Sequence, residues 1–119
     1  MRCLIIDDNI SITQMLSQFL TIKGHECTVS NNGRNGLQLI KQNHHDVVIL
    51  DLAIPEFSGF DILDGITQNG KITNQNIIVL TASSISKEQE EKLFIKGVRT
   101  CLRKPVSPEI LLKTLDSVK

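Results

Sequence analysis

Short apolar runs alternate with segments of helical periodicity along the whole chain. The runs have the length of β-strands and lie at residues 3–6, 26–30, 47–50, 77–80 and 99–103. Between them, apolar side chains recur every three or four residues, which is the spacing of one helix face. This alternation is typical of a parallel sheet that helices cover on both faces. The sequence therefore predicts an α/β sandwich.

Residues that cap helices stand at the ends of the predicted helical segments. Asn9 is suited to begin the first helix, and Gly24 to end it. Gly97 closes a charged helix, and Ser107 opens the last one. Residues 68–76 are expected to form a loop. The apolar positions expected to face the core include Met15, Leu16, Leu20, Phe60, Leu63, Ile66, Ile110, Leu111 and Leu115.

Two of the five predicted strands are more polar than the others. Glu26 and Thr28 interrupt the second strand, and Arg99 and Arg103 flank the fifth. Polar side chains are tolerated at sheet edges, whereas strands that are apolar on both faces need burial. We therefore expect a flavodoxin-like (βα)5 three-layer sandwich with a parallel five-stranded sheet in the order 2-1-3-4-5. Right-handed crossovers then place the first and fifth helices on one face and the other three on the opposite face.

The length of 119 residues matches one ordinary domain, so residues 1–119 are expected to form a single unit without an output domain. Thirteen basic residues balance thirteen acidic ones, so no net field draws the chain to nucleic acid or to a membrane surface. The apolar runs are far shorter than the roughly 20 residues of a membrane span, and the first residues form no signal peptide. We expect a cytoplasmic protein.

The three cysteines are far apart in the sequence and form no C-x-x-C pair. They are Cys3, Cys27 and Cys101. Free thiols are therefore expected. The three histidines stand at the ends of predicted elements without the spacing of metal ligands, so we expect them to be solvated. They are His25, His44 and His45.

Polar side chains of complementary kinds directly follow the predicted strands. They are Asp7, Asp8, Asp51, Thr81, Ser83 and Lys104. Each has an ordinary structural explanation when it is considered alone, but parallel strands end on one rim, where these groups should converge. Carboxylates about 5 Å apart repel by roughly 3 kcal/mol per pair at an effective dielectric constant of about 20, so the cluster requires a bound cation. Oxygen ligands in a site open to phosphate favour Mg²⁺.

The chemistry that these groups favour is phosphoryl transfer onto a carboxylate. Asp51 is the candidate nucleophile because it ends the central strand and faces the other groups. Lys104 is expected to pair with one phosphoryl oxygen, and the Thr81 hydroxyl to donate to another. The expected metal ligands are Asp7, Asp8, Asp51 and the main-chain carbonyl of Ala53.

Four short motifs occur in a fixed order and spacing. They are Ile5-Ile6-Asp7-Asp8-Asn9, Asp51 with Pro55 and Gly59, Leu80-Thr81-Ala82-Ser83, and Lys104-Pro105. Because these motifs occur together in this order, the entire chain resembles the CheY-like receiver domain of two-component response regulators. The resemblance implies that Asp51 takes a phosphoryl group from a phosphohistidine on a sensor histidine kinase or phosphotransfer protein. It also implies that Asp8 binds Mg²⁺ directly, that Asp7 does so largely through water, and that the Lys104-Pro105 peptide bond is cis.

The chain departs from the family pattern at Cys101. Receivers usually carry Tyr or Phe three residues before the lysine, and that ring moves inward when the threonine is drawn to the phosphate. A thiol is too small to act in this way, whereas Ile54 in place of the usual methionine is a mild exchange. We therefore hypothesise that the signal is carried by the loop after Thr81 and by the fourth helix. The expected surface for a downstream protein contains Arg99, Cys101 and Arg103.

Three alternatives start from the same residues. A flavin-binding protein shares the fold, but Asp7 and Asp8 would repel a flavin phosphate. A phosphatase with an aspartyl intermediate needs a second carboxylate where Ala53 stands, so we expect no enzyme beyond self-catalysed phosphorylation and slow hydrolysis at Asp51. A degenerate receiver that only binds proteins is disfavoured by the retained site groups, although Cys101 keeps it open. The start at Met1 favours a single-domain regulator over an excised receiver.

Overall fold

The computed structural model describes residues 1–82 and 85–118. The strands in this part of the chain are β1 (Arg2–Ile6), β2 (Glu26–Ser30), β3 (Val47–Asp51), β4 (Thr67–Gln68), β5 (Lys71–Ile72), β6 (Ile77–Thr81) and β7 (Thr100–Arg103). The helices are α1 (Ile10–Ile22), α2 (Gly33–Gln42), α3 (Gly59–Gly65), α4 (Lys87–Lys96) and α5 (Pro108–Val118). None of these helices is long and apolar enough to cross a membrane.

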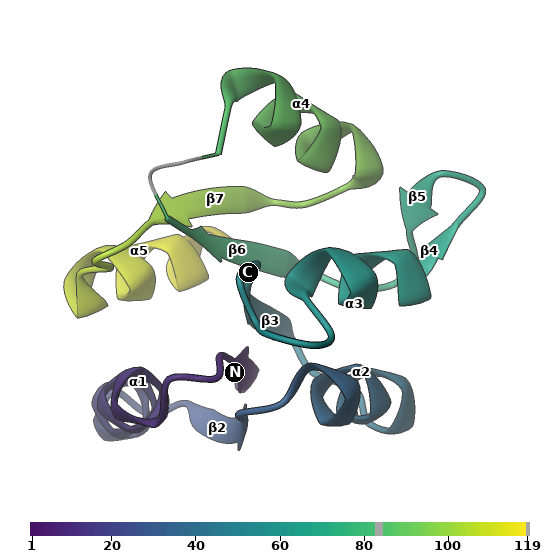
Figure 1. The fold of residues 1–119 in the computed structure, drawn as a ribbon. Helices are drawn as coiled ribbons and strands as arrows, with labels where there is room; N and C mark the ends of the chain where they lie inside the picture. The colour runs from purple at the N-terminus through teal and green to yellow at the C-terminus, as the bar shows by residue number, and fades with distance from the viewer. Residues whose placement is uncertain (83–84, 119) are drawn as a thin grey trace.

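The main sheet is parallel and has the strand order β2-β1-β3-β6-β7 (Figure 1). This order confirms the predicted arrangement 2-1-3-4-5. The central strands β3 and β6 are buried along their whole length, and β1 along all but its first residue. The edge strands β2 and β7 are only partly buried. The apolar content of each strand thus matches its place, because an interior strand is covered on both faces.

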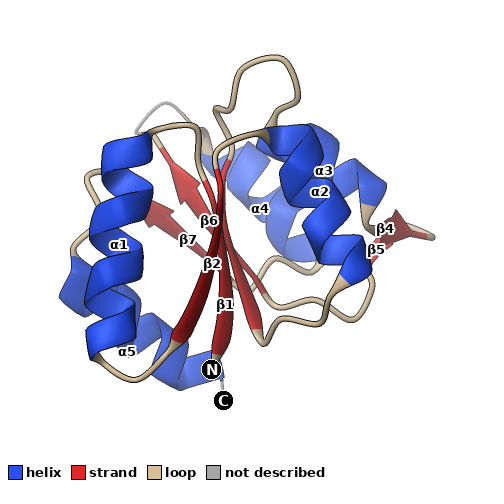
Figure 2. Ribbon diagram, turned by 90° about the horizontal axis from the view of Figure 1, so that it is seen from below, coloured by secondary structure: helices blue, strands red, loops and turns tan. Residues whose placement is uncertain are grey.

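Two helical layers enclose the sheet, with α1 and α5 on one face and α2, α3 and α4 on the other (Figure 2). Alternate residues of each strand supply the two cores. The core under α1 and α5 includes Ile5, Ile49, Leu80, Leu16 and Leu111. The opposite core includes Leu4, Leu50, Val79, Ile62 and Leu93. Full burial of each such side chain contributes about 1.5–3 kcal/mol relative to exposure.

Three of the apolar positions expected to face the core lie on the surface instead. Met15 and Phe60 are each 42% exposed, and Ile110 is 54% exposed. The adjacent Leu16 and Leu111 are buried. A helix that packs on one side buries only a narrow stripe of side chains. The predicted apolar faces are therefore wider than the stripes that the structure buries.

Capping residues begin and end the helices where the sequence predicts. The Asn9 side chain accepts a hydrogen bond from the Ile12 N–H at the start of α1. At the end of α4, Gly97 has φ of 116°, a left-handed conformation that glycine adopts without strain. Asn9 thus begins α1 shortly after the carboxyl end of β1, and Gly97 ends α4 shortly before β7.

Residues 68–76, predicted to form a loop, contain most of a small antiparallel hairpin of β4 and β5. Asn69 (φ 53°) and Gly70 (φ 81°) form its turn. The loop prediction is wrong here because an Asn-Gly pair readily supplies the two positive φ angles of a tight hairpin. The hairpin contacts the C-terminal end of α4, where the Lys71 ammonium donates to the Ile95 carbonyl at 2.6 Å.

Two of the three histidines are buried, which corrects the prediction of solvated side chains. His25 is 9% exposed and His45 is 4% exposed. The Met1 amino group lies 3.1 Å from Nδ1 of His25, whereas Nδ1 of His45 has no hydrogen-bond partner among the described residues. Burial lowers the pKa of His45. Both histidines lie beside the start of β1, where Met1 contacts His25 and Arg2 borders the same hollow as His25 and His45. Such packing between distant segments covers side chains at the ends of predicted strands and helices.

The first residue of α3, Gly59, permits a close approach between two segments. A Cβ at this position would lie 2.5 Å from the Asp51 carbonyl oxygen and 2.7 Å from the Leu52 Cα, both of which are backbone atoms. We expect Gly59→Ala to lower the free energy of unfolding by about 1–3 kcal/mol, measured by urea denaturation. Gly65→Ala is the control, because its Cβ would meet only the flexible side chain of Leu37. Equal losses for both variants would contradict this account.

Candidate functional site

The described site residues lie together at the carboxyl ends of the main-sheet strands. Asp7 follows β1, Asp51 ends β3, Thr81 ends β6 and Lys104 follows β7. The parallel registers bring these strand ends to the same level. Ser83, also predicted for this rim, lies outside the described residues.

Three carboxylates meet at this rim. Asp7, Asp8 and Asp51 each offer an oxygen, and these atoms lie within 4.8 Å of one another. Asp7 and Asp51 are buried, whereas Asp8 is exposed. The Asn9 N–H donates to Oδ1 of Asp7 at 2.9 Å, and the Ala53 N–H donates to Oδ1 of Asp51 at 3.2 Å. Each buried carboxylate is therefore oriented by the backbone two residues further along the chain.

The Lys104 ammonium binds the second oxygen of both buried carboxylates. Its Nζ lies 2.9 Å from Oδ2 of Asp7 and 3.4 Å from Oδ2 of Asp51. Burial acts to lower the pKa of Lys104, but its hydrogen bond to Asp7 and the charge of Asp51 outweigh burial and raise that pKa. The side chain is therefore charged at neutral pH. The peptide bond between Lys104 and Pro105 is cis, as the resemblance implies.

Asp51 is ionised less readily than an ordinary aspartate. Burial raises the pKa of Asp51, and the neighbouring charge of Asp7 acts in the same direction. The Ala53 N–H and Lys104 oppose this shift without cancelling it. One ammonium thus leaves the carboxylates incompletely neutralised.

The donor set fits a hard divalent cation. All side-chain donors in the cluster of Asp7, Asp8 and Asp51 are carboxylate oxygens, and the exposure of Asp8 leaves the site open to solvent. Such sites suit Mg²⁺, which retains several waters. Ala53, the predicted main-chain ligand, is exposed next to the cluster. The residues present are therefore compatible with the expected metal.

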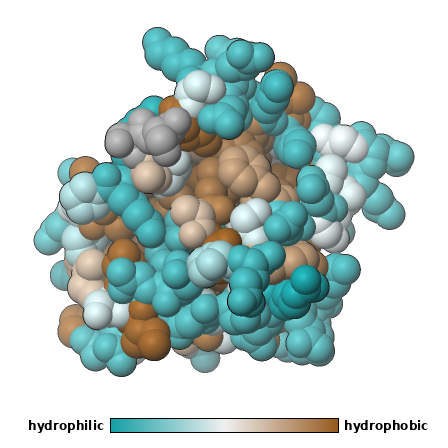
Figure 3. Space-filling view, in the orientation of Figure 1, coloured by the Kyte–Doolittle hydropathy of each residue, from teal (hydrophilic) through white to brown (hydrophobic). Residues whose placement is uncertain are grey.

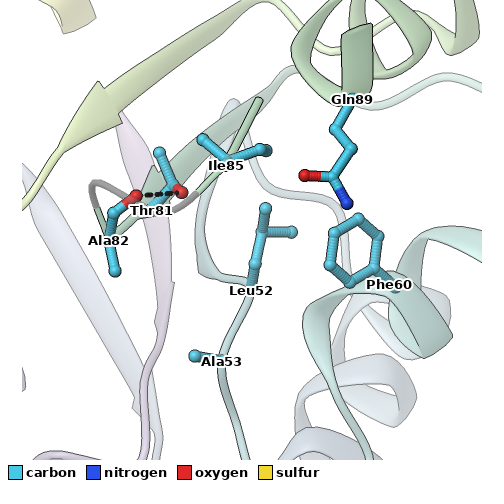
Figure 4. A pocket seen from close by; sticks show the side chains of 7 residues that line it. All are labelled: Leu52, Ala53, Phe60, Thr81, Ala82, Ile85 and Gln89. Carbon is cyan, nitrogen blue, oxygen red and sulfur yellow. Dashed lines mark hydrogen bonds between the residues drawn. The ribbon is translucent and has the colours of Figure 1, made fainter. Parts of the chain in front are cut away.

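Thr81 lies between the carboxylate cluster and a hollow at the start of α4. Its hydroxyl is buried and donates to the Ala82 carbonyl at 2.8 Å. The hollow is lined by Leu52, Ala53, Phe60, Thr81, Ala82, Ile85 and Gln89 (Figure 4). Apolar side chains gather in this part of the surface, between α3 and α4 (Figure 3). Thr81 therefore borders an apolar hollow. Its hydroxyl would have to break the hydrogen bond to the Ala82 carbonyl before it could donate to another acceptor.

Asn31 supports the site in a way that the motifs do not predict. Its side-chain amide donates to the Asp7 carbonyl at 2.8 Å and to the Thr13 hydroxyl at 3.0 Å. The sequence identifies Asn31 only as a turn residue before the second helix. Its position directly after β2, beside β1, is the signal that could have linked it to Asp7.

Comparisons with known proteins agree with this geometry. The model of the response regulator receiver domain family matches residues 3–116. Protein PilH of Pseudomonas aeruginosa is 34% identical over 98% of this chain and 96% of its own length. The sensor histidine kinase RcsC of Escherichia coli is 29% identical over 97% of this chain, which spans only 12% of RcsC.

A solved structure shows the same arrangement of elements. The chemotaxis protein CheY4 of Vibrio cholerae has a TM-score of 0.86 to this chain at 32% identity, and the match covers 99% of this chain and 98% of CheY4. The family model spans nearly the whole chain, and the strand order and rim residues are consistent with it. The chain therefore belongs to the response regulator receiver domain family.

Proposed function

We propose that the chain is a phosphoacceptor switch in which Asp51 receives a phosphoryl group from a partner histidine kinase or phosphotransfer protein, in a reaction that requires Mg²⁺. The observation that carries this proposal is the buried Asp51 carboxylate, which lies close to two other carboxylates and 3.4 Å from the Lys104 ammonium. Membership of the receiver family supports the same function.

The residues have distinct tasks in the proposed transfer. A carboxylate oxygen of Asp51 attacks the phosphorus, and the bond from phosphorus to the imidazole nitrogen of the donor breaks. Asp7, Asp8, Asp51 and the Ala53 carbonyl would hold Mg²⁺, which supplies positive charge next to the incoming oxygens. Lys104, which contacts Asp7 and Asp51 in this structure, would pair with one phosphoryl oxygen. The Thr81 hydroxyl donates to another after leaving the Ala82 carbonyl.

We infer that the conformational change caused by phosphorylation is transmitted from Thr81 to α4 and to β7. Ile85 and Gln89 line the same hollow as Thr81, so a shift of the threonine changes the surroundings of both. Cys101 is partly buried against the core on the α4 side, and Arg103 forms an ion pair with Glu90 of α4 at 3.5 Å. The exposed Arg99 and Arg103, with Cys101, form the proposed edge for a downstream protein.

Turnover should be slow in this proposal. Ala53 carries no group that could act as a general acid two residues after Asp51. The chain would then catalyse only its own phosphorylation and a slow hydrolysis. A constitutive protein-binding module without phosphorylation is the alternative, because Cys101 stands where the family usually has an aromatic ring.

Asp51→Asn tests acceptance of the phosphoryl group directly. We expect wild-type protein to gain one phosphoryl mass, or to bind beryllofluoride, when Mg²⁺ and acetyl phosphate or the mimic are added. An asparagine amide is not a nucleophile, so the variant should lose the adduct, as should wild type without Mg²⁺. Mass spectrometry gives the readout, and Asp64→Asn, an exposed site on α3, is the control. Wild type that stays unmodified would favour the constitutive binding module.

The same substitution tests the electrostatics of the cluster. Because the pKa of Asp51 is raised in the folded protein, its ionised form lowers the stability of the fold at every pH above that pKa. Asp51→Asn should therefore unfold at higher urea concentration than wild type at pH 7 without Mg²⁺. The difference should shrink as the pH falls toward about 4, where the unfolded-state carboxylate is protonated as well.

Mg²⁺ should stabilise wild type more than the variant, since a cation that binds only the folded state adds to its stability. Urea denaturation at several pH values, with and without Mg²⁺, provides the measurement. A variant that is less stable than wild type at pH 7 would contradict the role assigned to burial.

The output path is tested by the amide chemical shifts of residues 85–96. Beryllofluoride with Mg²⁺ should shift these amides in wild type, because Thr81 and the start of α4 share one hollow. Asp51→Asn should show no such change. If residues 85–96 keep their shifts while the site residues respond, the signal leaves the rim by another route.

A further inference from the structure

The pairing of β1 with β2 places two thiols side by side. The parallel register sets Cys3 opposite Cys27, and both side chains pack against the core under α1 and α5. Neighbouring strands lie about 4.8 Å apart, which is inside the range of about 4.4–6.8 Å that separates the Cα atoms of a disulfide. The structure holds both residues as free cysteines.

The two thiols differ in their access to solvent. Cys3 is completely buried, whereas Cys27 lies on the edge strand and is partly exposed. Cys27 also lines two surface hollows, one beside the start of β1 and the other along α1. Both cysteines border the first of these hollows, but the exposed part of Cys27 lets a small reagent reach it before the fully buried Cys3.

The pKa values of the two thiols also differ, and the more exposed Cys27 has the lower one. The neighbouring Cys3 side chain lowers the pKa of the Cys27 thiol to about 7, against the effect of burial, and the Thr21 side chain acts in the same direction as Cys3. The pairing with Cys27 and burial raise the pKa of Cys3. Burial, followed by the charge of Glu90, raises the pKa of Cys101 to about 11. Since the thiolate is the nucleophile, Cys27 is the reactive cysteine of the three.

The surroundings favour a redox site over a metal site. Within the described residues, the group of three or more ligating side chains close enough to share a metal is the carboxylate cluster at the opposite end of β1. Two neighbouring thiols without a third ligand are suited to forming a disulfide.

We propose that Cys27 and Cys3 form a peroxide-sensitive modification site, with Cys27 as the attacking thiolate and Cys3 as the resolving thiol. The Cys27 sulfur attacks one oxygen of hydrogen peroxide, the O–O bond breaks, and a sulfenic acid and hydroxide form. The Cys3 sulfur then attacks the Cys27 sulfur, and the sulfenic hydroxyl leaves with the Cys3 proton as water. Hydrogen peroxide gains two electrons, and the two thiols lose them. The product is a disulfide that ties the edge strand β2 to β1.

Peroxide treatment of the reduced chain tests this site. Wild type should lose the mass of two hydrogen atoms, yield a proteolytic peptide that links Cys3 to Cys27, and return to the starting mass with dithiothreitol. Cys101→Ser is the matched control and should behave like wild type. Cys27→Ser should form no disulfide, and Cys3→Ser should stop at a sulfenic acid that dimedone traps. An oxidised product that joins two chains, or one that contains Cys101, would overturn the proposal.

Alkylation of the unmodified chain provides a test that needs no variant. From their pKa values, Cys27 should react with iodoacetamide on the order of 100-fold faster than Cys101 at pH 7, after the lower nucleophilicity of the more acidic thiolate is included. Peptide mapping at short times measures both rates. Equal rates, or faster labelling of Cys3, would remove the basis for Cys27 as the attacking residue. Neither test depends on phosphorylation of Asp51.

Discussion

The bonds from Lys104 to Asp7 and Asp51 are the interactions on which the site depends. They connect the residue after the edge strand β7 with carboxylates at the ends of β1 and β3, which are central strands. Two buried carboxylates this close together would repel strongly without a cation between them. The parallel direction of the strands makes the contact possible, because it places all three strand ends on one rim. The same sheet that buries the apolar strands therefore also brings the charged side chains of the site together.

Much of this organisation could be predicted from the sequence, because it depends on local patterns. Strands that are apolar on both faces are expected in the interior and polar strands at the edges, and this assignment fits the flavodoxin-like order 2-1-3-4-5. The rim residues followed in turn from their positions after the strands. Burial of His25 and His45 could not be predicted in this way, because it depends on which segments cover the element ends. The pairing of Cys3 with Cys27 depends on strand register, which no local spacing reveals.

The two ends of β1 have different chemistry. Its carboxyl end leads into Asp7 and the cluster of three carboxylates, while Cys3 near its other end lies opposite Cys27 in the register with β2. Rigid, buried residues separate the two ends, and every residue from Cys3 to Asp7 is fully buried. The two proposed modification sites would therefore lie near opposite ends of one strand. The usual aromatic position, by contrast, holds Cys101, whose small side chain packs beside the core of the α4 side.

The hairpin of β4 and β5 has a mechanical consequence for α4. Lys71 holds the carbonyl of Ile95, and Lys96 forms an ion pair with Asp64 of α3 at 3.6 Å, so the C-terminal end of the helix is tied at two points. At its other end, the helix begins beside the apolar hollow next to Thr81. A body held at one end and pushed at the other rotates about the held end. In the proposed output, a shift of Thr81 would therefore displace the first turn of α4 more than the residues near Lys96.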